Sequence, residues 1–351
     1  MSNTALDFSE DDIQQLLDNL DHFSNDEIAE IDKMAGELST RKDNKAAYDD
    51  LISFCKLMMS EFIVGKHHRI LADMLMGIER GEKDRVCVNI PPRHGKSQLV
   101  SIFYPAWYLG RNPNKKVMMV SHTTDLAVDF GRKVRNLIAT DTYRSVFPTV
   151  KLARDSKSAG RWNTNVGGEY YACGIGSALA GRGADLLLVD DPHSEQDVIN
   201  GNFEVFAKAY EWFTFGARTR LMPGGSVAII QTRWHMDDLT GRVTNDMAKN
   251  NRSDQYEVVE FPAILEVKNK KTDRYVEKPL WPQFFDLEAL LRTKASMPTF
   301  QWNAQYQQNP TSEEASIVKR DWWNLWEQDS PPSSEYLIMS LDAAAETHNR
   351  A

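Results

Sequence analysis

The fold class of this chain follows from one segment, Val86-Cys87-Val88-Asn89-Ile90-Pro91-Pro92-Arg93-His94-Gly95-Lys96-Ser97. Its first five residues form a short, mostly apolar run that predicts a buried strand. Helical periodicity begins directly after the loop, over residues 96–109. A strand, a tight loop ending in Gly-Lys-Ser and a helix form the setting in which backbone N–H groups bind phosphate. The segment therefore predicts a nucleotide-phosphate site at one end of a strand.

The residues of this loop have different expected roles. Lys96 is expected to reach the β- and γ-phosphates, and the Ser97 hydroxyl is expected to bind Mg²⁺. Arg93 is a second cation, which can stabilise charge that develops on the γ-phosphate. The other loop residues expected to contact nucleotide are Pro92, His94, Gly95 and Gln98. Ile90 replaces the first glycine of the usual G-x-x-x-x-G-K-S/T pattern, so a surface turn before a capped helix is the competing interpretation.

A second apolar run, Leu186–Val189, ends in two acids, Asp190 and Asp191. Acids at the carboxyl end of a parallel strand lie in the crevice where such sheets bind ligands. We expect Asp190 to hold Mg²⁺, directly or through water, and Asp191 to orient and deprotonate the attacking water. An acidic turn after a strand is the competing interpretation. The Gly-Lys-Ser loop upstream disfavours this interpretation, because two independent motifs of the same kind of site rarely occur together by chance.

Two further polar positions belong to the predicted site. Arg182 lies in the glycine-rich stretch Gly174–Asp185. It is interpreted either as an exposed arginine in an ion pair or as an arginine finger that enters a neighbouring subunit's nucleotide site. Thr232 ends a third apolar run, where its hydroxyl can bond to the γ-phosphate or to the attacking water. His235, beside Trp234, is interpreted as a packed or surface residue rather than a metal ligand.

Short apolar runs alternate with helical stretches from residue 84 onward, which indicates a parallel sheet covered on both faces. The expected strands are 86–90, 117–121, 186–190 and 227–232, with 170–173 as an added edge strand. The expected helices between and after them are 96–109, 124–139, 203–221 and 286–307. Before residue 84 we expect helices that start at Ser9 and Ser24, with apolar helical spacing over 44–62 and 67–79.

Composition excludes several classes of protein. The chain has 351 residues, 42% of them hydrophobic and 26% charged, which does not fit a disordered or collagen-like protein. Its three cysteines form no C-x-x-C pair, which argues against a disulfide framework or a zinc site. No apolar run approaches the roughly 20 residues of a membrane helix, and residues 1–10 lack the start of a secretory signal. We therefore expect a cytoplasmic protein with no membrane partner.

The net charge of −9 originates in the N-terminal segment. Residues 1–50 carry 14 Asp/Glu and 4 Lys/Arg, a balance of −10, so the remaining 36 acids and 37 bases leave +1. A nearly neutral body neither requires nor excludes nucleic-acid binding, for which a local basic stripe is enough. Two stretches qualify, 131–135 and 268–278, although a solvated charged face explains each of them as well.

These separate motifs, in this order, resemble those of the large terminase subunit of tailed bacteriophages. The resemblance extends over roughly residues 60–342, and the segments that carry it are Pro91–Ser97, Ser121–Ala127, Gly181–Pro192, Thr232–His235, Leu280–Pro282 and Ala304–Pro310. It implies a three-layer α/β P-loop NTPase of the additional-strand, RecA-like type. A mostly parallel central sheet, a helical N-terminal segment and a C-terminal lid are expected.

The resemblance also implies a domain order and a function. The expected parts are an acidic helical segment (1–59), an ATPase core (60–265), a lid and linker (266–333) and the start of an RNase H-like nuclease domain (334–351). ATP and Mg²⁺ are the implied cofactors of a motor that moves double-stranded DNA through a portal into a procapsid, in the cytoplasm of an infected bacterium. The implied partners are this DNA, the portal protein, the small terminase subunit and other copies of the chain in a ring of five, although a monomer is compatible with the isolated chain.

By the same resemblance, Asp190 and Asp191 match the two-acid end of the Walker B strand, and Thr232 matches the coupling motif. Many members have glutamate at the second acid, so which acid is the base stays open. The adenine-contacting region matches best at His67 and His68.

Asp342 resembles the first metal ligand of the family's nuclease. The other nuclease acids are absent from the sequence. A two-metal nuclease needs several carboxylates, so we do not expect this chain to cut DNA.

Two other functions fit the nucleotide motifs. A helicase- or translocase-like DNA-dependent ATPase shares the strand-loop-lysine and acid-pair pattern, but it usually has a second RecA-like domain, which this sequence does not show. A non-catalytic nucleotide-binding scaffold predicts nucleotide binding without turnover. An ATPase assay that compares the wild type with Lys96→Ala separates the scaffold from both enzymes.

Overall fold

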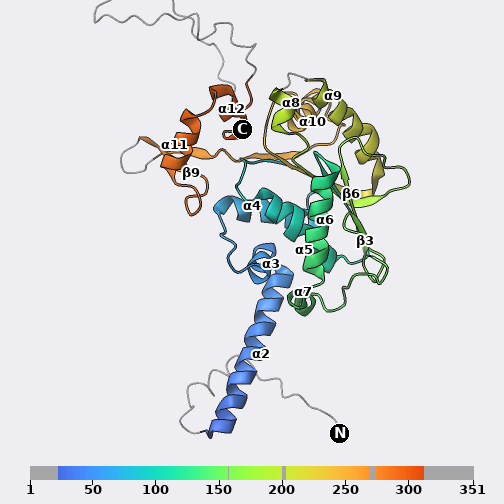
Figure 1. Cartoon of the computed structure of the whole chain (residues 1–351), viewed down its shortest axis with the longest axis vertical. Coiled ribbons are helices and arrows are strands. Elements are labelled where there is room, and N and C mark those ends of the chain that lie inside the picture. Colours follow the sequence, from blue (N-terminus) through green and yellow to red (C-terminus); the bar gives the residue numbers. More distant parts are fainter. Residues whose placement is uncertain (1–22, 157, 200–202, 269–273, 312–351) are drawn as a thin grey trace, which may run out of the picture. The chain divides into compact units, whose positions relative to one another are not determined.

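The computed structural model describes residues 23–156, 158–199, 203–268 and 274–311. Over these residues the chain is built on a seven-stranded sheet with the order β3-β4-β2-β5-β6-β1-β7. Figure 1 labels β3 and β6 of this sheet. Neighbouring strands are parallel except for the pair β3–β4. The strands are β1 (Arg85–Asn89), β2 (Lys116–Ser121), β3 (Arg161–Asn163), β4 (Glu169–Gly174), β5 (Ala184–Asp190), β6 (Leu221–Gln231) and β7 (Glu257–Glu260). The expected mostly parallel α/β sheet is confirmed.

Both faces of the sheet are buried, because alternate residues of its strands enter two different hydrophobic cores. In β1, Val86 and Val88 belong to one core and Cys87 belongs to the other. The strands β2, β5 and β6 divide in the same way. Side chains alternate across a strand, so this division means that helices cover each face. The arrangement has three layers.

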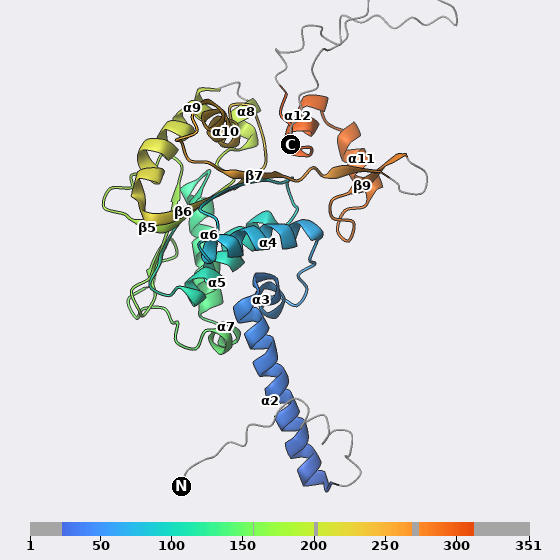
Figure 2. The same ribbon diagram turned by 180° about the vertical axis from the view of Figure 1, so that it is seen from behind.

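One face carries the helices from α3 to α7, and the other carries the group around α9 and α10 (Figures 1 and 2). The first group is α3 (Leu51–Met58), α4 (Lys66–Glu79), the π-helical η2 (Gln98–Phe103), α5 (Tyr104–Arg111), α6 (Thr124–Ile138) and α7 (Asp141–Val146). The second is α9 (Glu204–Glu211), the π-helical η3 (Trp212–Ala217), the short turn η4 (Arg218–Arg220) and α10 (Leu239–Lys249), with α8 (Glu195–Ile199) after β5. The helices expected from the sequence between the strands are therefore present.

The N-terminal helix α2 (Asn25–Asp49) begins where the sequence predicts. Ser24 and Glu27 form a capping box: the Ser24 N–H donates to the Glu27 carboxylate at 2.8 Å, and the Glu27 N–H donates to Ser24 Oγ at 3.4 Å. Asp50 ends α2 and caps α3 with its side chain, so the expected helical stretch is divided there. The other predicted start, Ser9, lies outside the described residues.

Three elements differ from the expectation. The expected edge strand is β4, and β3 lies beyond it as the antiparallel edge. The strand β7 was not expected, because its sequence has an acid at each end and no longer apolar run. The helical stretch expected after residue 286 is two helices, α11 (Leu287–Ala295) and α12 (Thr299–Gln305). They are separated at Pro298, because proline has no N–H to continue a helix.

The residues after β7 form a small core of their own. The strands β8 (Ile264–Lys268) and β9 (Tyr275–Pro279) form an antiparallel hairpin. Leu290 of α11 and Trp302 of α12 pack with Ile264 in a cluster separate from the two sheet cores. In the part of the chain that the structure describes, no helix is long and apolar enough to cross a membrane.

Candidate functional site

The loop after β1 has the backbone of an anion-binding turn. Arg93 has φ 62° and Gly95 has φ 80°, both in the left-handed region. A Cβ atom at Gly95 would lie 2.3 Å from His68 Nε2, so no side chain fits there. The loop leads into η2, and its N–H groups and the helix start provide the donors that phosphate groups require.

Two histidines hold this loop from behind. His67 Nε2 and His68 Nε2 lie 3.0 Å and 2.9 Å from the carbonyl oxygen of His94. The Gly65 N–H donates to His68 Nδ1 at 2.9 Å, which makes Nδ1 the acceptor and Nε2–H the donor of that ring. A trans peptide places its C=O and N–H on opposite sides. The Gly95 N–H therefore points away from the histidines.

The structure corrects the expected role of His67 and His68. Both side chains are fully buried, and neither lines the pocket described below, whereas the sequence placed them against the adenine. His94 is also fully buried, with its ring stacked on Phe285 at 4.9 Å. Burial lowers the pKa of His67, and it lowers the pKa of His68 to about 3 and that of His94 to about 4. The three rings are neutral at pH 7 and act as structural supports of the loop.

Lys96 joins the ends of three neighbouring strands. Its Nζ lies 2.8 Å from Asp191 Oδ2, just after β5, and donates to Thr232 Oγ1 at 3.1 Å, just after β6. The Thr232 hydroxyl donates in turn to the carbonyl of Ile90 at 3.1 Å, just after β1. The loop lysine, the second acid and the strand-tip threonine therefore share one cluster.

Asp190 lies inside the protein, and its contacts fit a magnesium ligand. Its Oδ2 accepts a hydrogen bond from Ser101 Oγ at 2.6 Å, and the nearby Ser97 hydroxyl acts to lower the pKa of this carboxyl group. Its Oδ1 and the hydroxyl of Ser121, its register partner on β2, are both buried and have no hydrogen-bond partner. Burial, and then the charge of Asp191, raise the pKa of Asp190. A buried carboxylate with an unsatisfied oxygen, beside a serine hydroxyl, fits Mg²⁺ and its oxygen ligands.

Asp191 faces the pocket. Its backbone is left-handed, with φ 44°, which breaks the alternation of the strand and keeps consecutive acids near one another. Its Oδ1 accepts the N–H of Thr232 at 2.8 Å, and 28% of its side chain is exposed. This acid is open to a bound water, whereas the Asp190 side chain is buried.

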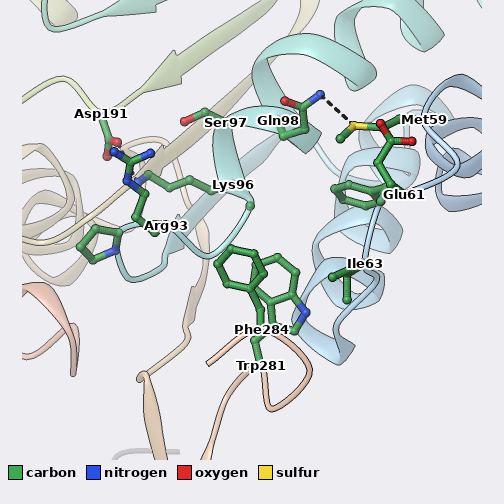
Figure 3. A pocket seen from close by; sticks show the side chains of 13 residues that line it. Met59, Glu61, Ile63, Arg93, Lys96, Ser97, Gln98, Asp191, Trp281 and Phe284 are labelled. Carbon is green, nitrogen blue, oxygen red and sulfur yellow. Dashed lines mark hydrogen bonds and ion pairs between the residues drawn. The ribbon is translucent and has the colours of Figure 1, made fainter. Parts of the chain in front are cut away.

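The pocket beside the loop has a volume of about 610 Å³ (Figure 3). Its phosphate-binding end is lined by Pro92, Arg93, Gly95, Lys96, Ser97, Gln98 and Asp191. Its other end is lined by Met59, Glu61, Phe62 and Ile63 before α4 and by Trp281 and Phe284 after β9. The Trp281 and Phe284 rings are stacked with centroids 4.4 Å apart. A flat base fits between apolar and aromatic side chains, so this end suits the nucleobase.

The sequence indicated only part of the pocket's second end. Residues 280–282 carried the family resemblance but had no assigned role, and residues 59–63 gave no signal. Gln98 was expected among the nucleotide contacts. It lines the pocket beside Met59, to whose sulfur its Nε2 donates at 3.9 Å (Figure 3). Only the packing of these segments brings them to the loop.

Arg182 lies near the amino-terminal ends of the strands, opposite the carboxyl ends that carry the site. Its guanidinium is 3.4 Å from Glu169, the first residue of β4, and 4.6 Å over the ring of Tyr171. It precedes β5, whereas Asp190 ends that strand. A strand of seven residues spans about 23 Å, so Arg182 does not reach the nucleotide pocket of its own chain.

The turn after β6 is held by a buried ion pair. Arg233 Nε donates to both oxygens of Asp238, at 3.1 Å and 2.9 Å, and Asp238 also caps α10. His235 stacks on Phe206, with ring centroids 5.2 Å apart, which confirms a packed histidine. Among the described residues no cluster of His, Cys, Asp and Glu is arranged to hold a metal ion. Asp342 lies outside those residues.

Comparisons with known proteins agree with the resemblance in the sequence. Residues 87–325 match the family described as terminase large subunit, T4likevirus-type, N-terminal. No curated protein matches the chain. Similar solved structures include the HK97 bacteriophage large terminase (12% identity, TM-score 0.46, covering 71% of this chain and 51% of that one). Another is the Thermus phage P74-26 large terminase ATPase domain (16% identity, TM-score 0.41, covering 68% of this chain and 93% of that one). A third is the large terminase of a thermophilic bacteriophage in complex with ATP-γ-S (9% identity, TM-score 0.36, covering 67% of this chain and 51% of that one).

This chain thus spans about half the length of the HK97 protein and of the terminase solved with ATP-γ-S. The TM-scores are low, so the fold is assigned from this chain's own strand order and from the two buried faces of its sheet.

Proposed function

Because this chain belongs to the T4-like-virus type of terminase large subunits, we propose that it is the ATP-hydrolysing motor of viral DNA packaging. The substrate that it moves is double-stranded DNA, which passes through a portal into a procapsid. Its site of action is the cytoplasm of the infected bacterium. The observation that carries the proposal is the cluster of Lys96, Asp191 and Thr232 beside the buried Asp190.

In the proposed reaction Lys96 leaves Asp191 to bind the β- and γ-phosphates of ATP. Asp191 then accepts a proton from a water molecule whose oxygen attacks the γ-phosphorus. The bond between this phosphorus and the β–γ bridging oxygen breaks, which releases ADP and phosphate. Arg93, exposed at the mouth of the pocket, stabilises charge on the phosphoryl group, and Thr232 orients the water. Ser97 and Asp190 would hold Mg²⁺, which supplies charge neutralisation at the phosphates.

The assembly around this site is also part of the proposal. The chain forms a ring of five on the portal, and the small terminase subunit and the DNA are its other partners. Arg182 enters the site of a neighbouring copy, for which it must leave Glu169. The proposed division into residues 1–59, 60–265, 266–333 and 334–351 assigns the pocket to the second and third parts, with Met59 from the end of the first. DNA cutting is a separate expectation that concerns Asp342.

Steady-state ATP hydrolysis by the wild type and by Lys96→Ala tests the proposal. Wild-type turnover that rises with procapsids or portal, and that Lys96→Ala lacks, is the expected result. Nucleotide binding without turnover under all conditions would favour a scaffold.

Stimulation by single-stranded DNA instead of portal would favour a helicase-like enzyme. The described residues form one seven-stranded sheet and one hairpin, with no second nucleotide-binding core of the kind that helicases usually carry.

A further inference from the structure

Gln308 connects the candidate site to the segment that follows α12. Its side chain is fully buried, and its Oε1 accepts the backbone N–H of Arg233 at 3.1 Å. Its Nε2 donates to the carbonyl of Gln305. Its backbone is left-handed, with φ 56°, a conformation that is costly for a residue with a side chain. Strain of this kind persists only where surrounding contacts hold it, and it is concentrated at functional sites.

The hydrogen bond between Gln308 and Arg233 lies directly beside Thr232 of the candidate site. The N–H of Thr232 donates to Asp191 Oδ1 at 2.8 Å, and the next N–H along the chain, that of Arg233, donates to Gln308. Two consecutive amides at the tip of β6 are therefore held by two side chains from different segments. A shift of Gln308 therefore acts on the peptide unit between Thr232 and Arg233, directly beside the bond from the Thr232 N–H to Asp191.

We propose that Gln308 is a positioning residue that sets the Thr232–Asp191 geometry for hydrolysis and reports the state of the site to the end of α12. The inference rests on the proposed ATPase function. Lys96 donates to Thr232 Oγ1 at 3.1 Å, and a transfer of Lys96 to phosphate removes that contact. The tip of β6 then has a different set of hydrogen bonds, and Gln308 transmits this change to the end of α12.

Gln307 is a matched control for Gln308. Its side chain binds the N–H and the carbonyl of Ile264, at 3.3 Å each, and so anchors the same end of α12 to β8. These two bonds lead to the hairpin and not to the tip of β6. The variants Gln307→Met and Gln308→Met each remove two side-chain hydrogen bonds with little change in length, but only Gln308→Met leaves the Arg233 N–H without its acceptor.

The test compares the full chain and both variants by two measurements in Mg²⁺: affinity for a non-hydrolysable ATP analogue and single-turnover hydrolysis of ATP. We expect Gln308→Met to lower the hydrolysis rate about tenfold with an affinity within about twofold of wild type, since a buried donor loses its partner beside the reacting groups. Gln307→Met is expected to retain the rate. Equal rate losses in both variants, in proportion to their melting temperatures, would overturn the proposal.

Hydrogen exchange of the wild type provides a measurement that needs no variant. Binding of the analogue is expected to change the exchange of backbone amides at residues 303–309, and this change is expected to disappear in Gln308→Met. The proposal would be overturned if the analogue protected the phosphate-binding loop of the wild type from exchange but left the exchange at residues 303–309 unchanged. A wild type that binds no nucleotide would instead overturn the proposed function, so the two failures are distinguishable.

Discussion

Asp190 and Asp191 are adjacent in sequence but differ in every physical respect that determines a carboxylate's role. Asp190 is buried, has an unsatisfied oxygen and accepts a hydrogen bond from Ser101, whereas Asp191 is partly exposed and paired with Lys96. The environment of a carboxyl group decides whether it serves as ligand, acid or base. The loss of one acid should therefore differ from the loss of the other.

We expect Asp191→Asn to bind Mg²⁺-ATP with an affinity near that of the wild type but to lower turnover by about 100-fold or more, because the proton acceptor is lost. Asp190→Asn should lose the Mg²⁺ dependence of nucleotide affinity. Calorimetric titrations with and without Mg²⁺, together with single-turnover rates, measure both. Reversed phenotypes would exchange the roles of the two acids.

His68 is the second residue whose replacement has a specific expected effect. His68→Ala removes a donor to the His94 carbonyl and an acceptor for the Gly65 N–H, both buried. We expect a loss of about 2–4 kcal/mol in the free energy of unfolding. The affinity for ATP should fall as well, because the loop is no longer held. His68→Gln, which retains a donor near Nε2, should recover part of the affinity in chemical denaturation and binding assays. Unchanged ATP affinity in a folded His68→Ala would remove the supporting role.

The turn from β6 to α10 shows how a polar pair fixes an element. Asp238 is fully buried, and besides Arg233 it accepts the N–H groups of Gly241 and Trp234. Removing one member of a buried pair leaves an uncompensated charge. The strand tip that carries Thr232 therefore depends on an ion pair that lies one residue beyond it.

Asp238→Ala should lower the free energy of unfolding by about 3–5 kcal/mol, because the buried Arg233 guanidinium loses its closer partner and keeps only the contact with Glu260 at 3.4 Å. The neighbouring Asp237, whose side chain is 60% exposed, is the control, and Asp237→Ala should change stability by less than about 0.5 kcal/mol. Urea denaturation of both variants checks this. Similar losses in the two would argue against the pair as the source of stability.

Elements were predictable from the sequence where the local pattern alone determines them. The strands β1, β2 and β5 and the second half of β6, from Val227 onward, are nearly continuous apolar runs, and Ser24 with Glu27 forms a local cap. The strand β7 was not predictable, because its place beside β1 depends on tertiary pairing of an ordinary sequence. Likewise the spacing of Gly95, Lys96 and Ser97 revealed the loop, whereas the histidine contacts with a backbone carbonyl left no sequence pattern.

For the molecule as a whole, four buried histidines determine the response to acid. Burial lowers the pKa of His67, that of His68 to about 3, and those of His94 and His193 to about 4. In the unfolded chain a histidine has a pKa of about 6.5. The unfolded state therefore binds more protons, and the stability that these groups contribute above pH 6.5 is lost as the pH falls. Asp190, whose pKa is raised, acts in the opposite direction with one proton at most.

We expect the free energy of unfolding to fall between pH 7 and pH 5, by up to about 1.4 kcal/mol per pH unit for each histidine. Denaturant titrations across this range measure the slope. A folded His68→Gln should reduce the slope by about one proton. A stability that is constant from pH 7 to pH 5 would mean that these rings are charged in the folded protein.

Arg182 precedes the strand that Asp190 ends, and this polarity has a geometric consequence. No copy of the chain can serve itself, so a contact that brings this arginine to a nucleotide joins the front of one copy to the back of the next. Such a head-to-tail junction uses two unlike surfaces and repeats with one fixed rotation, which yields either a closed circle or an open spiral. In the proposed ring, hydrolysis in each copy therefore requires the Arg182 of one neighbour.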